Sequence, residues 1–147
     1  MTVTRDIPAP RHRVWEVLAD GWTYSQWVVG NSRMRAVDKN WPAAGSTIQH
    51  SIGAWPFVIN DETVAEKCQP ESELVLLAKT SALGAQRVTL RLSDTPNGCR
   101  VEMSELPAQG PMNLVPDRIA EMGVDVRNRE CLWRLENIVM QRDSSEL

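Results

Sequence analysis

The sequence predicts an α+β domain in which an antiparallel sheet of about seven strands packs against a long C-terminal helix. Three observations support this prediction. Six segments of alternating or apolar residues lie between residues 32 and 105, each bounded by turn-forming residues. The hydrophobic period then becomes helical after about residue 114. No repeat, linker or low-complexity stretch divides the 147 residues, so we expect a single domain over residues 1–147.

The N-terminal part predicts one strand and two short helices. Thr2–Ile7 alternates weakly and is bounded by prolines, which is typical of a short strand. Pro10–Asp20 follows as a helix, since proline is tolerated at the start of a helix, where its missing N–H costs nothing. Gly21 ends this helix, and Trp22–Val28 forms the second one. The apolar side of the first helix consists of Val14, Trp15, Val17 and Leu18.

The middle of the chain predicts an antiparallel sheet with one buried face. Asn97-Gly98 is the clearest turn, because this pair readily adopts the positive φ angles of a hairpin. The two segments beside it alternate cleanly between apolar and polar residues, as strands with one wet face do. The predicted strands are Ser32–Lys39, Ser46–Gly53, Phe57–Cys68, Glu73–Ser81, Gln86–Ser93 and Cys99–Glu105.

The C-terminal helix is expected from about Leu114 to Gln141, a length of about 42 Å at 1.5 Å per residue. It carries two apolar stripes on nearly opposite sides. Either the helix is buried on two sides, or it bends near Gly123. The first stripe contains Val115, Ile119, Met122 and Val126, and the second contains Cys131, Leu135 and Ile138.

Charge and hydropathy exclude several classes of protein. The net charge is −3, with 16 basic and 19 acidic residues, which argues against a nucleic-acid partner and against a polybasic membrane-surface protein. The longest apolar run, Leu74–Ala78, is far shorter than the roughly 20 residues of a membrane span. Charged residues and prolines near the start leave no room for the apolar core of a signal peptide.

The cysteines, the histidines and the motifs that the sequence lacks limit which metal sites, disulfides and cofactors we expect. The 3 cysteines are odd in number and far apart, which fits neither a disulfide framework nor a zinc site and favours a reduced, cytoplasmic protein. The 2 histidines form no metal-binding pattern, so we expect no metal. Glycine-rich phosphate loops and a nucleophile elbow are also missing from the sequence. We therefore expect no cofactor.

The N-terminal part of the chain carries a resemblance to a known family in the residues Ile7-Pro8-Ala9-Pro10, Val14, Trp15, Val17, Leu18, Asp20, Tyr24 and Trp27. With the order of the predicted elements, it resembles the SRPBCC superfamily, which includes START-like proteins, polyketide cyclase/dehydrase-like proteins and the birch-pollen allergens. The resemblance implies a helix-grip fold, in which a strongly curved sheet wraps around the C-terminal helix and encloses a hydrophobic cavity. It fixes architecture far better than activity, because none of these residues forms a catalytic motif.

His50 is the first candidate for a functional polar group. It alternates with Ile48 and Ile52, so these three side chains share one face of the strand. If that face is concave, His50 is a general acid or base, or a hydrogen-bonding anchor for a ligand oxygen. The alternative is a core histidine bonded to a backbone carbonyl, or a register that exposes it.

Glu105 is the second candidate, because it continues the inward alternation of Val101 and Met103. Burial would disfavour its charged form and make it a candidate proton donor. The alternative is that the strand ends before Pro107 and leaves Glu105 in solvent.

The remaining candidates are apolar residues expected to line the cavity. Tryptophans near the predicted cavity mouth either line it or pack in the core. The loop Leu106–Met112 is either a gate or a plain connector. With His50 and Glu105, the expected lining comprises Trp27, Trp41, Ile48, Ile52, Trp55, Phe57, Leu76, Leu90, Met103, Ile119 and Met122.

Three functions fit these expectations. The first is a carrier or sensor that binds a small hydrophobic molecule, such as a lipid, polyketide or aromatic compound. The second is a polyketide cyclase/dehydrase-type enzyme in which His50 or Glu105 moves protons. The third is a protein-interaction module without a ligand. Homodimerisation is compatible with all three.

Overall fold

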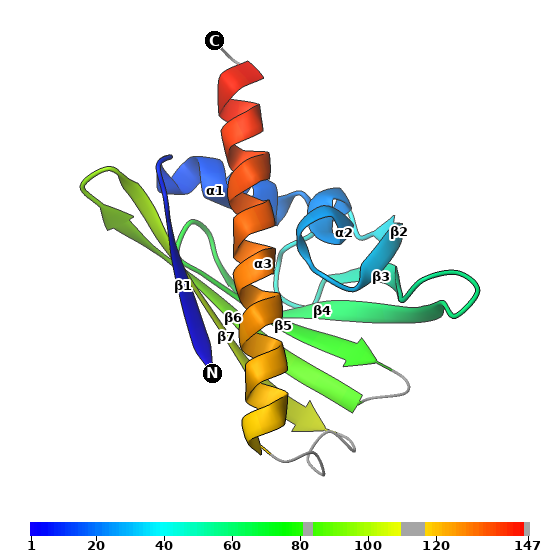
Figure 1. Ribbon diagram of the computed structural model, residues 1–147. Helices are drawn as coiled ribbons and strands as arrows, with labels where there is room; N and C mark the ends of the chain where they lie inside the picture. The colour runs from blue at the N-terminus through cyan, green and yellow to red at the C-terminus, as the bar shows by residue number, and fades with distance from the viewer. Residues whose placement is uncertain (81–83, 110–116, 146–147) are drawn as a thin grey trace.

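The computed structural model describes residues 1–80, 84–109 and 117–145. These form a seven-stranded sheet, three short helical segments and one long helix (Figure 1). The strands are β1 (Thr2–Ile7), β2 (Asn31–Val37), β3 (Thr47–Ile52), β4 (Ile59–Gln69), β5 (Glu73–Thr80), β6 (Gly84–Thr95) and β7 (Gly98–Gln109). The helical segments are α1 (Arg11–Ala19), η1 (Gly21–Thr23), α2 (Tyr24–Trp27) and α3 (Asp117–Ser145).

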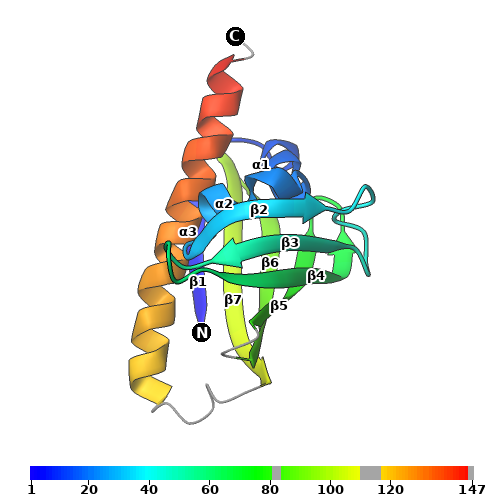
Figure 2. The ribbon, with the colours of Figure 1, turned by 90° about the vertical axis from the view of Figure 1, so that its right-hand side faces the viewer.

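The sheet is antiparallel throughout, in the order β1-β7-β6-β5-β4-β3-β2. It curves around α3, and the short helices lie beside the C-terminal half of α3 (Figures 1 and 2). The predicted helix-grip arrangement is therefore confirmed. The predicted second short helix is divided, because the 3-10 turn η1 precedes a single helical turn, α2.

The hairpin of β6 and β7 is the longest in the sheet, with 12 residues in each strand. Its Asn97-Gly98 turn also contacts the end of β1. A Cβ on Gly98 would lie 2.2 Å from the Ile7 carbonyl oxygen and 2.7 Å from the Ala9 nitrogen, so only glycine fits. β7 continues past Pro107 to Gln109, which takes Leu106–Gln109 of the predicted gate into the sheet. The rest of that predicted loop lies outside the described residues.

Helix α3 buries only one of its two apolar stripes. Cys131 and Leu135 of the second stripe are fully buried, together with Leu132 and Val139. In the first stripe, Met122 is 72% exposed and Val126 is 69% exposed, so burial on two sides is wrong for these residues. The reason is that the sheet covers α3 on one side only (Figure 2). Leu114, Val115 and the side chain of Ile119 lie outside the described residues.

Among the residues that the structure describes, we find no helix with the length and hydropathy needed to cross a membrane.

The unequal burial of the two stripes predicts how the free energy of unfolding changes when single side chains of α3 are replaced by alanine. Leu135→Ala removes a fully buried side chain and should lower the free energy of unfolding by about 2–5 kcal/mol. Met122→Ala, on the exposed side of the same helix, should change it by less than about 0.5 kcal/mol. Urea denaturation of both variants measures these effects, and equal losses would contradict this orientation of α3.

Candidate functional site

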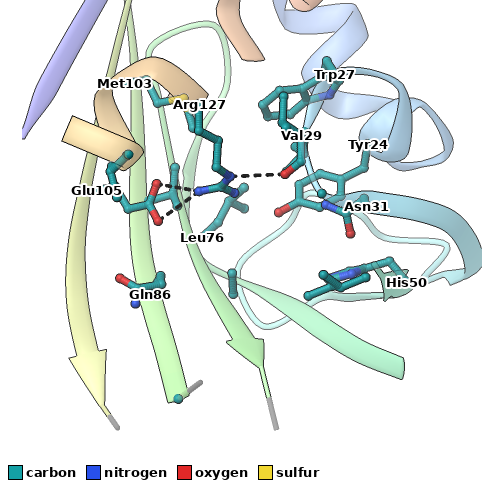
Figure 3. A pocket seen from close by; sticks show the side chains of 18 residues that line it. Tyr24, Trp27, Val29, Asn31, His50, Leu76, Gln86, Met103, Glu105 and Arg127 are labelled. Atoms are coloured by element: carbon teal, nitrogen blue, oxygen red, sulfur yellow. Dashed lines mark hydrogen bonds and ion pairs between the residues drawn. The ribbon is translucent and has the colours of Figure 1, made fainter. Parts of the chain in front are cut away.

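A cavity of about 460 Å³ lies between the concave face of the sheet and the N-terminal half of α3. It is lined mainly by apolar side chains and backbone (Figure 3). Six predicted residues line it: Trp27, His50, Ile52, Leu76, Met103 and Glu105. The other lining residues are Tyr24, Val28, Val29, Gly30, Asn31, Ala78, Gly84, Gln86, Val88, Gly123, Val124 and Arg127.

One wall of the cavity carries an ion pair that joins the sheet to α3. Glu105 is 7% exposed, because β7 continues beyond it and its side chain points inward. Nη1 of Arg127 donates to both carboxylate oxygens of Glu105, at 3.1 and 3.0 Å. Nε of Arg127 donates to the backbone oxygen of Val29 at 3.2 Å. Arg127 thus connects α3 with β7 and with the segment after α2 (Figure 3).

Across the cavity, a chain of hydrogen bonds runs between three buried side chains. His50 Nε2 lies 2.9 Å from Thr63 Oγ1, and the Tyr24 hydroxyl lies 3.4 Å from the same oxygen. The rings of Tyr24 and His50 have centroids 5.4 Å apart. Burial raises the pKa of Tyr24 to about 12, although its hydrogen bond to Thr63 opposes this shift. Tyr24 is therefore a neutral phenol at neutral pH.

His50 is 2% exposed, and its burial lowers its pKa from the ordinary value of 6.5. Asp61, opposite His50 in the β3–β4 register, acts against this shift by favouring the imidazolium. Asp61 is itself buried. Because the pKa of His50 is lowered, its imidazole is neutral at pH 7. Within the described residues, no group bonds to its Nδ1 atom.

Three predicted lining residues lie at the surface. Trp55 is 89% exposed and Phe57 is 85% exposed, because both belong to the β3–β4 turn. β4 begins at Ile59, two residues later than the sequence predicts, so Phe57 is not part of a strand face. Met122 lies on the solvent side of α3. The expectation that these three residues line the cavity is therefore wrong.

Three others are buried in the core and do not line the cavity. Ile48 shares the face of His50, but it lies where η1 covers the sheet. A Cβ on Gly21 would lie 3.0 Å from Trp41 Cδ1 and 3.1 Å from Ile48 Cγ2, so this end of the sheet leaves no space. Leu90 pairs with Leu74 and Met103 deeper in the sheet and is fully buried. The lining expected of Trp41, Ile48 and Leu90 is thus corrected to core packing.

Residues that the sequence analysis missed come mostly from α3 and the segment after α2. Arg127 belongs to a charged run that is typical of a solvated helix face, and its buried partner lies 22 positions away. Tyr24 entered the sequence analysis only through the family resemblance. Asn31 begins β2, one residue before the strand that the sequence predicts from Ser32. The only sequence signal for Arg127 is the inward alternation of Glu105, which calls for a cationic partner.

Within residues 1–80, 84–109 and 117–145, no group of three or more His, Cys, Asp or Glu side chains could hold a metal ion. All three cysteines lie in these segments, and none forms a disulfide. Cys131 accepts a hydrogen bond from the Val29 amide, with N and Sγ 3.3 Å apart. Burial raises the pKa of its thiol, so it remains protonated at neutral pH.

Comparisons with known proteins agree on the fold. The profile of a family described as polyketide cyclase / dehydrase and lipid transport matches residues 1–137. A search of curated proteins finds no match. Protein NE0264 from Nitrosomonas europaea is similar in structure, with a TM-score of 0.76, 18% identity, and coverage of 98% of this chain and 96% of that one.

Two further solved structures have the same fold. Ara h 8.0201 has a TM-score of 0.71 and 11% identity, with 96% of this chain and 97% of that chain covered. The di-domain ARO/CYC StfQ from the steffimycin biosynthetic pathway has a TM-score of 0.75 and 9% identity, with 98% of this chain and 51% of that chain covered. At these identities the likeness shows the fold alone.

The buried Glu105–Arg127 pair predicts that losing Arg127 alone destabilises the protein more than losing both charges. Arg127→Leu leaves the buried Glu105 carboxylate without its cation and should lower the free energy of unfolding by on the order of 2 kcal/mol. Adding Glu105→Gln should restore most of this loss, as measured by urea denaturation. As a control, Arg100→Leu breaks the exposed pair with Asp6 and should leave stability nearly unchanged. Similar losses in the two single variants would contradict a special role for the buried pair.

His50 predicts a pH dependence with a defined sign. Its pKa is lower in the folded than in the unfolded chain, so the unfolded chain binds more protons between these two pKa values. The free energy of unfolding should therefore fall as the pH drops below about 6.5. His50→Gln should remove this component, whereas His12→Gln, at an exposed position, should retain it. Urea denaturation between pH 7.5 and 5 compares the slopes, and identical slopes in all three proteins would refute the assignment.

Proposed function

Since this chain belongs to the polyketide cyclase/dehydrase and lipid transport family, we propose that it binds a small hydrophobic molecule in the cavity, as a carrier or sensor. The family match and the helix-grip neighbours also confirm the SRPBCC resemblance of the sequence. The ligand class, the carrier or sensor role and the cytoplasmic location remain proposals. Homodimerisation and the absence of a nucleic-acid partner also stay predictions.

The observation that carries the proposal is a mainly apolar cavity that the protein's own side chains leave open. Its volume of about 460 Å³ falls within the range of ligand pockets. Apolar surface that moves from water into such a site gains about 25 cal/mol per Å². A ligand that buries about 250 Å² of apolar surface would gain roughly 6 kcal/mol before its binding costs. Affinity can therefore arise here without catalysis.

A second candidate function is catalysis of the cyclase/dehydrase kind. It is favoured by two polar groups that face one cavity: the His50–Thr63–Tyr24 chain and the Glu105–Arg127 pair. With its proton on Nε2, the neutral imidazole of His50 would present Nδ1 as a general base. Glu105 suits the role of proton donor less well than the sequence suggested, because both its oxygens accept hydrogen bonds from Arg127.

A ligand-free interaction module, the third reading, has the least support. Such a module has no need of an internal cavity, and a collapsed core would stabilise it. The open volume beside Leu76 and Met103 argues for a molecule that fills it.

Native mass spectrometry of the freshly purified protein tests the proposal directly. A discrete additional mass, extracted and identified, would establish a container and its ligand class. Repeated purification from different growth media with only the bare mass, and no shift of melting temperature with any hydrophobic compound tested, would contradict the proposal.

Filling the cavity predicts loss of the bound molecule. Ala78→Phe places a large side chain into the lining and should abolish the additional mass, because the ligand and the ring compete for the same volume. Ala36→Phe adds the same group to an exposed position on β2 and should retain it. Native mass spectra of the two variants, each checked for folding by circular dichroism, make the comparison. An unchanged ligand signal in the folded Ala78→Phe variant would place binding elsewhere.

A further inference from the structure

We infer that the ligand of this cavity is an uncharged molecule with an apolar body and one hydroxyl group, and that His50 Nδ1 and Asn31 Oδ1 bind this hydroxyl. The inference rests on the proposed function and adds the chemical class of the ligand to it. It follows from the hydrogen-bonding capacity that two neighbouring strands leave unused at one wall of the cavity.

Two buried polar atoms on this wall have no hydrogen-bond partner among the described residues. They are His50 Nδ1 and Asn31 Oδ1, and both residues line the cavity. They belong to the paired strands β2 and β3, where Asn31 lies opposite Ile52. Figure 3 shows both side chains on the same wall, away from Glu105. Neither atom is open to solvent in the ligand-free structure, so a ligand hydroxyl reaches them when the two side chains turn toward the cavity. A buried polar atom without a partner costs free energy, so a ligand that satisfies both atoms gains affinity.

The hydrogen-bond chain behind His50 indicates which group fits. Asn31 Oδ1 accepts only, so the ligand must bring a donor. If the Tyr24 hydroxyl donates to Thr63 Oγ1 and Thr63 donates to His50 Nε2, then the imidazole proton sits on Nδ1 and points to the ligand. A hydroxyl oxygen can accept from Nδ1–H while its own proton is donated to Oδ1. A ketone or ether oxygen would satisfy Nδ1 alone.

The charges around the cavity disfavour an ionised ligand. Arg127 is the one permanent cation among the described lining residues, and the carboxylate of Glu105, which its Nη1 atom binds, neutralises its charge. A carboxylate beside Asn31 would face the amide oxygen without a donor and would lose its hydration without gaining an ion pair. A charged amine would approach the proton on His50. An alcohol or phenol meets neither obstacle.

Three probes with the same ring system test the inference: 2-naphthol, naphthalene and 2-naphthoate. Isothermal titration calorimetry at pH 7 gives the affinity of the intact protein for each. We expect 2-naphthol to bind about tenfold more tightly than naphthalene, as two new hydrogen bonds to buried groups would produce. We expect 2-naphthoate to bind more weakly than naphthalene.

Variants then assign the preference to the two residues. Asn31→Leu and His50→Phe keep the side chains large and apolar, and each should reduce the preference for 2-naphthol over naphthalene to less than about threefold. Gln69→Leu is the matched control, because it removes an exposed amide at the end of β4, outside the cavity lining. It should leave the preference intact. Circular dichroism checks that each variant folds.

The outcomes separate this inference from the proposed function. Equal binding of 2-naphthol and naphthalene, or tightest binding of 2-naphthoate, overturns the hydroxyl site and leaves a cavity that binds hydrophobic molecules. Failure of all three probes to bind contradicts both. A preference for 2-naphthol that Asn31→Leu and His50→Phe both retain overturns the assignment to β2 and β3. Because the wild-type ratio is itself decisive, the test does not depend on the folding of any one variant.

Discussion

The packing of α3 along only part of the concave sheet is the constraint on which the rest of the structure depends. The C-terminal half of the helix closes the core through Cys131, Leu132, Leu135 and Val139, with the short helices beside it. Further toward its N-terminus the helix presents Gly123, Val124 and Arg127 to the sheet. The small glycine and the ion-paired arginine do not fill the space that the curved strands enclose. The C-terminal half of α3 packs closely against the sheet. The cavity is the volume that remains between the sheet and the N-terminal half of the helix.

The polar groups of the cavity are consequences of this geometry. A helix that does not fill the concave face needs another connection to it, and Arg127 provides one by binding both β7 and the segment after α2. Away from the helix, the His50–Thr63–Tyr24 chain satisfies polar side chains that the β3–β4 pair directs inward. The two polar walls differ in character, since one is charged and internally paired while the other is neutral and retains unused hydrogen-bonding capacity. This asymmetry orients a ligand that has one polar end.

The fold was predictable from the sequence because its signals are local. Period-two alternation, the Asn97-Gly98 turn and the change to a helical period each involve a few neighbouring residues. The strand side of the site followed from the same rule, which placed His50, Ile52 and Glu105 on inward faces.

The helix side of the site was not predictable, since tertiary packing decides which face of α3 turns inward. Hydropathy alone favoured Met122 over Arg127, whereas the structure exposes Met122 and directs Arg127 to Glu105. Phe57 was misplaced because the boundary of β4 shifts by two residues, whereas Trp55 lies in the β3–β4 turn and is exposed there. Such a shift moves a side chain from a strand face into a turn.

Val29 holds both of its backbone polar groups against α3: its N–H donates to Cys131 Sγ and its oxygen accepts from Arg127 Nε. The two helix residues are four positions apart, so one turn of α3 binds both peptide groups that flank the Cα of Val29. Any displacement of the helix from the sheet must therefore carry the segment after α2 with it or break both bonds. The rate at which the Val29 amide exchanges its hydrogen for deuterium would thus report on the position of a helix to which Val29 does not belong.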